Sequence, residues 1–136
     1  MARLVKSIVS GSNVTGLGET TSSDQLEGRF AVEVAHLTDA ANISVDFGAN
    51  QNFSVTLATG TARTLDNPSN IVVGQTGSFF ISQDGTGNAT LSYDTYYDFV
   101  GGTAPTITAT PNAVDRIDYV VRTTTSIHCV HTANYS

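Results

Sequence analysis

The chain has 136 residues, a length typical of one domain, with a formal net charge of -6 at pH 7 and only 13% charged residues. Because charged residues usually make up about 25% of a soluble domain, the polar surface must come largely from Thr, Ser, Asn and Gln. Only six residues are Lys or Arg. This excludes a strongly basic surface and argues against a nucleic-acid partner, since affinity for phosphate backbones depends on those side chains.

The single cysteine, Cys129, excludes an intrachain disulfide and therefore the disulfide-rich class of small extracellular domains. No apolar run approaches the ~20 residues that span a bilayer. Residues 1–10 also lack the continuous apolar stretch of a secretory signal. We therefore expect a protein that is made in the cytoplasm, folds by packing alone and has no membrane partner.

Residues 1–28 are rich in Gly, Ser and Thr, and a segment of this composition buries little apolar surface by itself. We predict an extended N-terminal arm over residues 1–28 and a β-domain over residues 29–136. Aliphatic residues near the start, such as Leu4 and Ile8, favour one short strand that becomes ordered on a neighbouring subunit or partner. The alternative is a frayed terminus without a role.

The β-domain begins with an alternating segment in which Phe30, Val32 and Val34 fall on one face, as in a half-buried strand. A helix is the competing interpretation, because apolar residues also recur every three or four positions from Leu26 to Leu37. We predict a strand here.

Nine further segments have the composition of short strands and are separated by turns rich in Gly, Asn, Asp and Pro. They are residues 43–47, 52–57, 62–65, 77–83, 89–93, 96–99, 106–109, 114–122 and 126–130. This spacing predicts an all-β sandwich or barrel, and of the two we choose an antiparallel β-sandwich of the jelly-roll type. In the segment 114–122, Ile117, Tyr119 and Val121 share the face that we expect in the core.

The clearest turn is Asp-Gly-Thr-Gly-Asn at residues 84–88, which we predict to close a hairpin between the strands on either side. Pro105 and Pro111 flank a segment that suits an edge strand. Just beyond it, we expect Asp115 to cap the turn at Pro111 and Asn112 by accepting hydrogen bonds from backbone N–H groups.

Several of these strands and turns occur together in an order that resembles a known module. The fragments are NFSVTL at 52–57, RTLDNP at 63–68, GQTG at 74–77, QDGTG at 83–87, GTAP at 102–105 and NAVD at 112–115. In this order they resemble a β-module of tail-fibre, appendage and other virion proteins of tailed phages. The resemblance covers about residues 50–130, and it implies an all-β unit that is often trimeric.

Because only a short arm precedes the β-domain, the resemblance favours a capsid decoration or cement protein over a long fibre. It implies a homotrimer on the outer surface of the virion capsid that binds the major capsid protein or other virion proteins. The arm residues expected to contact the capsid are Arg3, Leu4, Lys6 and Ile8. The alternative is a tail-fibre or appendage component that binds a host receptor or glycan.

Tyr93, Tyr96 and Tyr97 form an aromatic cluster beside a break in the alternating pattern. Tyrosines near a loop stack on sugars and anchor protein interfaces, so we single out these three as candidate contacts with a partner or glycan. Packing in the core is the competing role for some of them.

Three residues near the C-terminus, His128, Cys129 and His131, have side chains that bind metals. In a strand, however, His128 faces one side while Cys129 and His131 face the other, which leaves too few ligands for a metal site within one chain. The interpretation we prefer is a terminal strand with a buried thiol, and we predict no metal or cofactor.

Acidic residues offer two further chemical hypotheses. Asp94 and Asp98 bracket two tyrosines, as paired carboxylates do in a glycosidase cleft, and Asp84 and Asn88 lie in a Gly-rich loop that resembles part of a calcium site. Aspartates in turns more often bind the backbone. Since the sequence also lacks an HExxH motif or a nucleophile elbow, we predict that the protein is not an enzyme.

Overall fold

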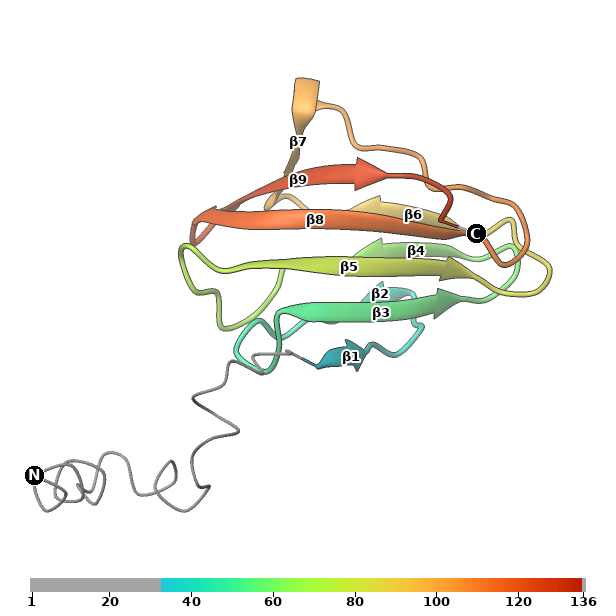
Figure 1. The fold of residues 1–136 in the computed structure, drawn as a ribbon, viewed down its shortest axis with the longest axis horizontal. Helices are drawn as coiled ribbons and strands as arrows, with labels where there is room; N and C mark the ends of the chain where they lie inside the picture. Colours follow the sequence, from blue (N-terminus) through green and yellow to red (C-terminus); the bar gives the residue numbers. More distant parts are fainter. Residues whose placement is uncertain (1–32, 136) are drawn as a thin grey trace, which may run out of the picture. The chain divides into compact units, whose positions relative to one another are not determined.

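The computed structural model describes residues 33–135, which form an all-β domain, as predicted (Figure 1). The strands are β1 (Val34–His36), β2 (Asn42–Ile43), β3 (Asn52–Leu57), β4 (Ala62–Leu65), β5 (Thr76–Gln83), β6 (Thr90–Tyr93), β7 (Tyr97–Phe99), β8 (Val114–Thr123) and β9 (Ser126–Thr132), with one 3-10 turn, η2 (Val100–Gly102). Within residues 33–135, no helix is long and apolar enough to cross a membrane. The predicted arm, with Arg3, Leu4, Lys6 and Ile8, lies outside the described residues.

The strands form two sheets, and the chain alternates between them. The large sheet has the order β1-β3-β5-β8-β9-β7 and the small sheet has the order β2-β4-β6 (Figure 1). β1, β3 and β5 pair in parallel, and so do β2, β4 and β6. Each strand of the large sheet up to β5 is thus followed by one of the small sheet, which makes three successive coils of a short solenoid.

This arrangement corrects the predicted antiparallel jelly-roll. Five of the seven strand pairs in the described residues are parallel, and only β5–β8 and β8–β9 are antiparallel. Alternating apolar residues fit both architectures, because in each of them one face of every strand is buried. The alternation therefore predicts the strands but not their direction.

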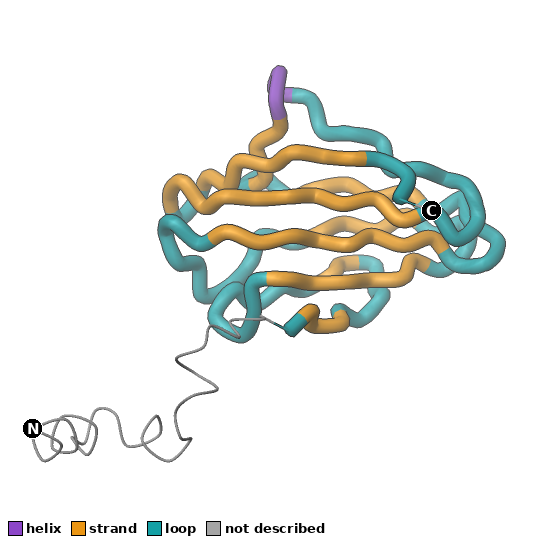
Figure 2. Tube along the Cα trace, in the orientation of Figure 1, coloured by secondary structure: helices purple, strands orange, loops and turns teal. Residues whose placement is uncertain are grey.

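After the third coil, the chain returns to the large sheet and extends it. β8 pairs with β5, β9 folds back on β8, and β7 lies in parallel along the outer edge of β9. Figure 2 shows the loop after η2 running from the β7 edge back toward the start of β8. The extension gives the large sheet an outward-facing surface formed by β7, β9 and β8.

The core lies between the two sheets and contains a stack of aromatic rings. Phe53 and Phe79 are register partners on neighbouring parallel strands, and their ring centroids are 5.3 Å apart. Phe47 stacks on Tyr119 at 4.7 Å. Parallel coils place equivalent positions above one another, which explains why aromatic residues stack here. Ile117, Tyr119 and Val121 are buried, as predicted.

Several predicted elements differ from the structure. Within the predicted first strand, Val34 is 46% exposed while Ala35 packs against the core, so the expected face is reversed. Of the predicted strand 43–47, only the first residue is in a strand, and residues 106–109 form a loop. The competing helix from Leu26 to Leu37 is also wrong at its end, since β1 is extended.

The loop at residues 84–88 does not close a hairpin. It joins β5 in the large sheet to β6 in the small sheet. Its backbone still needs positive φ angles, 80° at Gly87 and 67° at Asn88, because the chain turns sharply at this corner. The hairpin in the described residues is β8–β9, where Thr125 N–H bonds to Thr123 Oγ1 without any Gly or Asn in the turn.

Candidate functional site

The structure does not bring the three candidate tyrosines onto one surface. Tyr97 is buried, and its hydroxyl donates to the carbonyl oxygen of Asp66 at 2.9 Å. The Tyr93 ring packs edge-on against Phe99 with centroids 4.7 Å apart, and its buried hydroxyl has no hydrogen-bond partner among the described residues. Burial raises the pKa of Tyr93 and of Tyr97. Tyr93 and Tyr96 are both half-buried against the core, but the Tyr93 hydroxyl is buried, so Tyr96 is the stronger candidate for the proposed contact.

Strand β9 places His128 on one face and Cys129 and His131 on the other, as predicted. His128 faces outward, whereas Cys129 is buried and burial raises the pKa of its thiol to about 12. His131 faces the same way as Cys129 and contacts Asp115. Within residues 33–135, no group of three or more His, Cys, Asp or Glu side chains is placed to hold a metal ion.

Asp115 is the most buried charged group of the described residues, at 1% exposure. Its Oδ2 accepts from Thr108 N–H at 2.7 Å and lies 2.8 Å from His131 Nε2, while its Oδ1 accepts from Asn134 N–H at 2.8 Å. Burial alone would raise the pKa of this carboxyl, but the hydrogen bonds from Asn134, His131 and Thr108 outweigh burial and lower it. Asp115 therefore anchors three segments.

These partners correct the predicted cap. Asp115 does accept backbone N–H bonds, but from Thr108 and Asn134 and not from the turn at Pro111. In that turn, Asn112 N–H donates to the carbonyl oxygen of Asp84. With every oxygen of Asp115 engaged in structural contacts, the Asp115–His131 pair serves to fix the fold.

The acidic residues considered for catalysis lie in separate contacts. Asp94 accepts from Thr95 N–H at 2.7 Å, whereas Asp98 accepts from Ser126 Oγ at 2.6 Å. No hydrogen bond joins the two carboxylates to a shared group in the described residues. Their contacts are those of turn-capping and strand-joining groups.

Asp84 is likewise used by the fold. Its Oδ2 accepts from Thr59 N–H at 2.7 Å and from Thr59 Oγ1 at 2.6 Å, and its Oδ1 accepts from Thr86 and Gly87 N–H groups. These bonds lower the pKa of Asp84, and the bond from the Thr59 side chain has the largest effect. The carboxylate ties the second coil to the third, so the candidate calcium loop is a corner of the solenoid.

Two glutamines of the motifs were not predicted as site residues, yet their amides make several hydrogen bonds, with Gln83 buried and Gln75 half-buried. Gln83 Nε2 donates to the carbonyl oxygens of Ala89 and Thr108 at 2.9 Å, and its Oε1 accepts from Ala89 N–H at 3.0 Å. Gln75 Nε2 donates to the carbonyl oxygens of Phe47 and Asn50. The available signal was their position next to Gly and Asp in the fragments GQTG and QDGTG.

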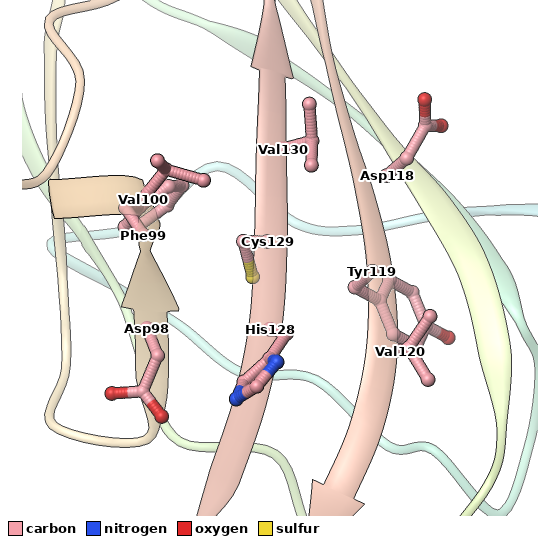
Figure 3. A pocket seen from close by; sticks show the side chains of 9 residues that line it. All are labelled: Asp98, Phe99, Val100, Asp118, Tyr119, Val120, His128, Cys129 and Val130. Carbon is pink, nitrogen blue, oxygen red and sulfur yellow. The ribbon is translucent and has the colours of Figure 1, made fainter.

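The outward face of β7, β9 and β8 carries a shallow groove of about 480 Å³ (Figure 3). Apolar side chains of Val100, Val120 and Val130 lie along it. Asp98 and His128 are register partners within it. Such a surface suits packing against another protein, because removing exposed aliphatic groups from water lowers the free energy.

Comparison of the chain with protein-family models, with curated proteins and with solved structures finds no match in any of the three. The function must therefore be inferred from the residues and the geometry.

Proposed function

We propose that this chain is a structural protein of a tailed-phage virion, a decoration or cement protein that binds the outer capsid shell and stabilises contacts between capsomers. It acts without catalysis and as a homotrimer. Its partners are the major capsid protein or other virion proteins.

The observation that carries the proposal concerns the motifs that resemble the virion module. Among their residues, Gln75, Gly77 and Asp84 make contacts between coils, while Gln83 and Asp115 fix the loop that precedes β8. A methyl group added at Gly77 would lie 1.8 Å from the Gln51 carbonyl oxygen, so this glycine is required by the close approach of two strands. The resemblance thus rests on residues with physical roles in the fold.

A rigid domain with few charges suits attachment to a repeated lattice. Inter-coil bonds such as Asp39 Oδ1 with Arg63 Nε at 2.7 Å and Asp46 Oδ1 with Asn70 Nδ2 at 2.8 Å hold the solenoid together. On a symmetric shell, many weak contacts of one kind combine through avidity. In the proposal, Arg3, Leu4, Lys6 and Ile8 supply part of these contacts.

The test is binding of the purified full-length chain to capsid shells that lack it. We expect saturable co-sedimentation with the shells, and weaker binding when Arg3→Ala and Lys6→Ala are combined. Arg29→Ala, which removes a basic residue outside the predicted arm, is the control and should bind as the original chain does. Absence of co-sedimentation would overturn the proposal.

The alternative, a tail component that binds a receptor or glycan, has less support. It depended on three tyrosines, and the hydroxyls of Tyr93 and Tyr97 are buried. Tyr96 is its strongest remaining candidate. Binding on a glycan array that is lost in Tyr96→Ala would favour this alternative over shell decoration.

A further inference from the structure

Three valines form an apolar surface on the outward face of the large sheet, and we call them the valine patch. Val100 is 86% exposed, Val130 is 57% exposed and Val120 is 49% exposed. They belong to three neighbouring segments, since Val100 follows β7 directly, Val130 lies on β9 and Val120 lies on β8. Side chains of this kind on adjacent strands are a feature of interfaces more than of free sheet surfaces.

The strand register makes the valine patch continuous. Asp118 pairs with Val130 and Val120 pairs with His128, so the two valines are diagonal neighbours across β8 and β9. Val100 lies on the other side of β9, at the end of β7 (Figure 3). The three valines line the same groove of about 480 Å³.

The rest of this face of the sheet differs in composition. The outward side chains of β3 and β5 include Ser54, Thr56, Ser78 and Ser82, with half-buried Phe80 as the apolar exception. A uniformly mixed surface would spread the valines over the sheet. Apart from Val34 on β1, the exposed valines of the large sheet and the turn after β7 instead lie together, on β8, on β9 and directly after β7.

The rim of the valine patch carries charges of both signs. Asp98 and Asp118 are its acids, while Arg116 and Arg122 project from the same side of β8 as Asp118. Within one chain, Arg116 already pairs with Asp118 at 3.0 Å, whereas Arg122 has no ion pair among the described residues. A partner of a single charge sign would meet repulsion somewhere on this rim. An identical rim can instead place acids opposite bases.

We infer that the valine patches of neighbouring copies of this chain pack against one another, which makes the outward face of β7, β9 and β8 the self-association surface. This inference rests on the proposed function for its homotrimer and names the surface that would build it. Packing the patches removes all three exposed valines from water. The charges on the two rims are complementary, since Arg122 has no ion pair among the described residues and each rim carries acids.

Sedimentation velocity of the full-length chain, with no shells present, tests the inference. We expect the original chain to sediment as an oligomer and the combined variant Val120→Lys and Val130→Lys to dissociate, with a loss of affinity of about tenfold or more. The matched control is Val72→Lys with Val73→Lys, because these valines are 56% and 58% exposed but lie in the loop between β4 and β5. The control should remain an oligomer.

Circular dichroism shows whether the lysine variants are folded. If the double variant is unfolded, Val100→Lys replaces it, since Val100 lies outside the strands and its side chain is almost fully exposed. A monomeric original chain would overturn the inference, as would an oligomer that the control breaks and the patch variants do not. A monomer that still binds shells would remove this inference and the homotrimer of the proposed function, but not the binding to the shell. An oligomer that does not bind shells would remove only the proposed function.

Discussion

His131 Nε2 and Asp115 Oδ2 lie 2.8 Å apart, on the side of β8 and β9 that faces the core. The same carboxylate binds the N–H groups of Thr108 and Asn134. One side chain on β8 therefore fixes β9, the loop that precedes β8 and the residues that follow β9.

Replacing Asp115 tests this role. Asp115→Asn keeps the shape of the side chain but removes the charge and offers one acceptor oxygen where two are used, so we expect the free energy of unfolding to fall by about 2–4 kcal/mol. Asp118→Asn, on the same strand but partly exposed, should lower it by less than about 1 kcal/mol. Chemical denaturation measures both. Equal effects would show that burial of the carboxylate is unimportant.

The pKa of the Asp115 carboxyl is lowered in the folded chain, so stability should depend on pH in a defined direction. As pH falls, the unfolded chain binds protons first, near the usual Asp pKa of about 3.9. The contribution of Asp115 is thus present above that pH and is lost as pH falls through the lower folded value. The free energy of unfolding, measured between pH 7 and pH 2, should therefore fall below about pH 4.

Asp115→Asn should make this acid-side loss less steep, because one carboxyl with a lowered pKa is removed. Asp39 and Asp46, whose pKa values are lowered chiefly by hydrogen bonds from the side chains of Arg63 and Asn70, keep part of the dependence. An unchanged slope in the variant would contradict the assigned role of Asp115.

Two glycines that resemble each other in sequence context should respond differently to alanine. At Gly77 the new methyl group would lie 1.8 Å from the Gln51 carbonyl oxygen, so we expect Gly77→Ala to lower the free energy of unfolding by about 3 kcal/mol or more. At Gly85 nothing lies within 4 Å of the added group. Gly85→Ala should therefore change stability by less than about 1 kcal/mol. Similar unfolding midpoints for the two variants would contradict the packing of β3 on β5.

Tyr97 and Tyr93 form a second matched pair. The hydroxyl of Tyr97 donates to the Asp66 carbonyl oxygen, so Tyr97→Phe should lower stability by about 1 kcal/mol. The Tyr93 hydroxyl has no partner in the described residues, and its removal in Tyr93→Phe should leave stability unchanged or raise it. Thermal unfolding compares the two, and a larger loss for Tyr93→Phe would be the contrary result.

The strands were more predictable than their arrangement. The bounds of β3 and β4 match the predicted segments, because period-2 alternation depends only on which face of a strand is buried. The loop at residues 84–88 misled the prediction, since a solenoid corner and a hairpin both need residues that tolerate positive φ. The true β8–β9 hairpin turns at consecutive threonines, which give no turn signal.

The site residues were less predictable, for a related reason. Gln83 and Asp115 owe their roles to partners such as Thr108 that the coil stacking brings near them. Without strand direction, these partners cannot be assigned. The valine patch was also hidden, because Val120 and Val130 satisfy the alternation of a half-buried strand whether their outward face meets water or another chain.

Imaging of the particle tests the central claim, decoration of a capsid shell, most directly. Virions assembled with and without this chain would be compared as difference maps from electron cryo-microscopy. The proposal predicts extra density at symmetry-related positions on the outer surface of the head, of a size that fits the domain formed by residues 33–135. Heads that are identical in the two preparations, with or without a difference on the tail, would contradict it.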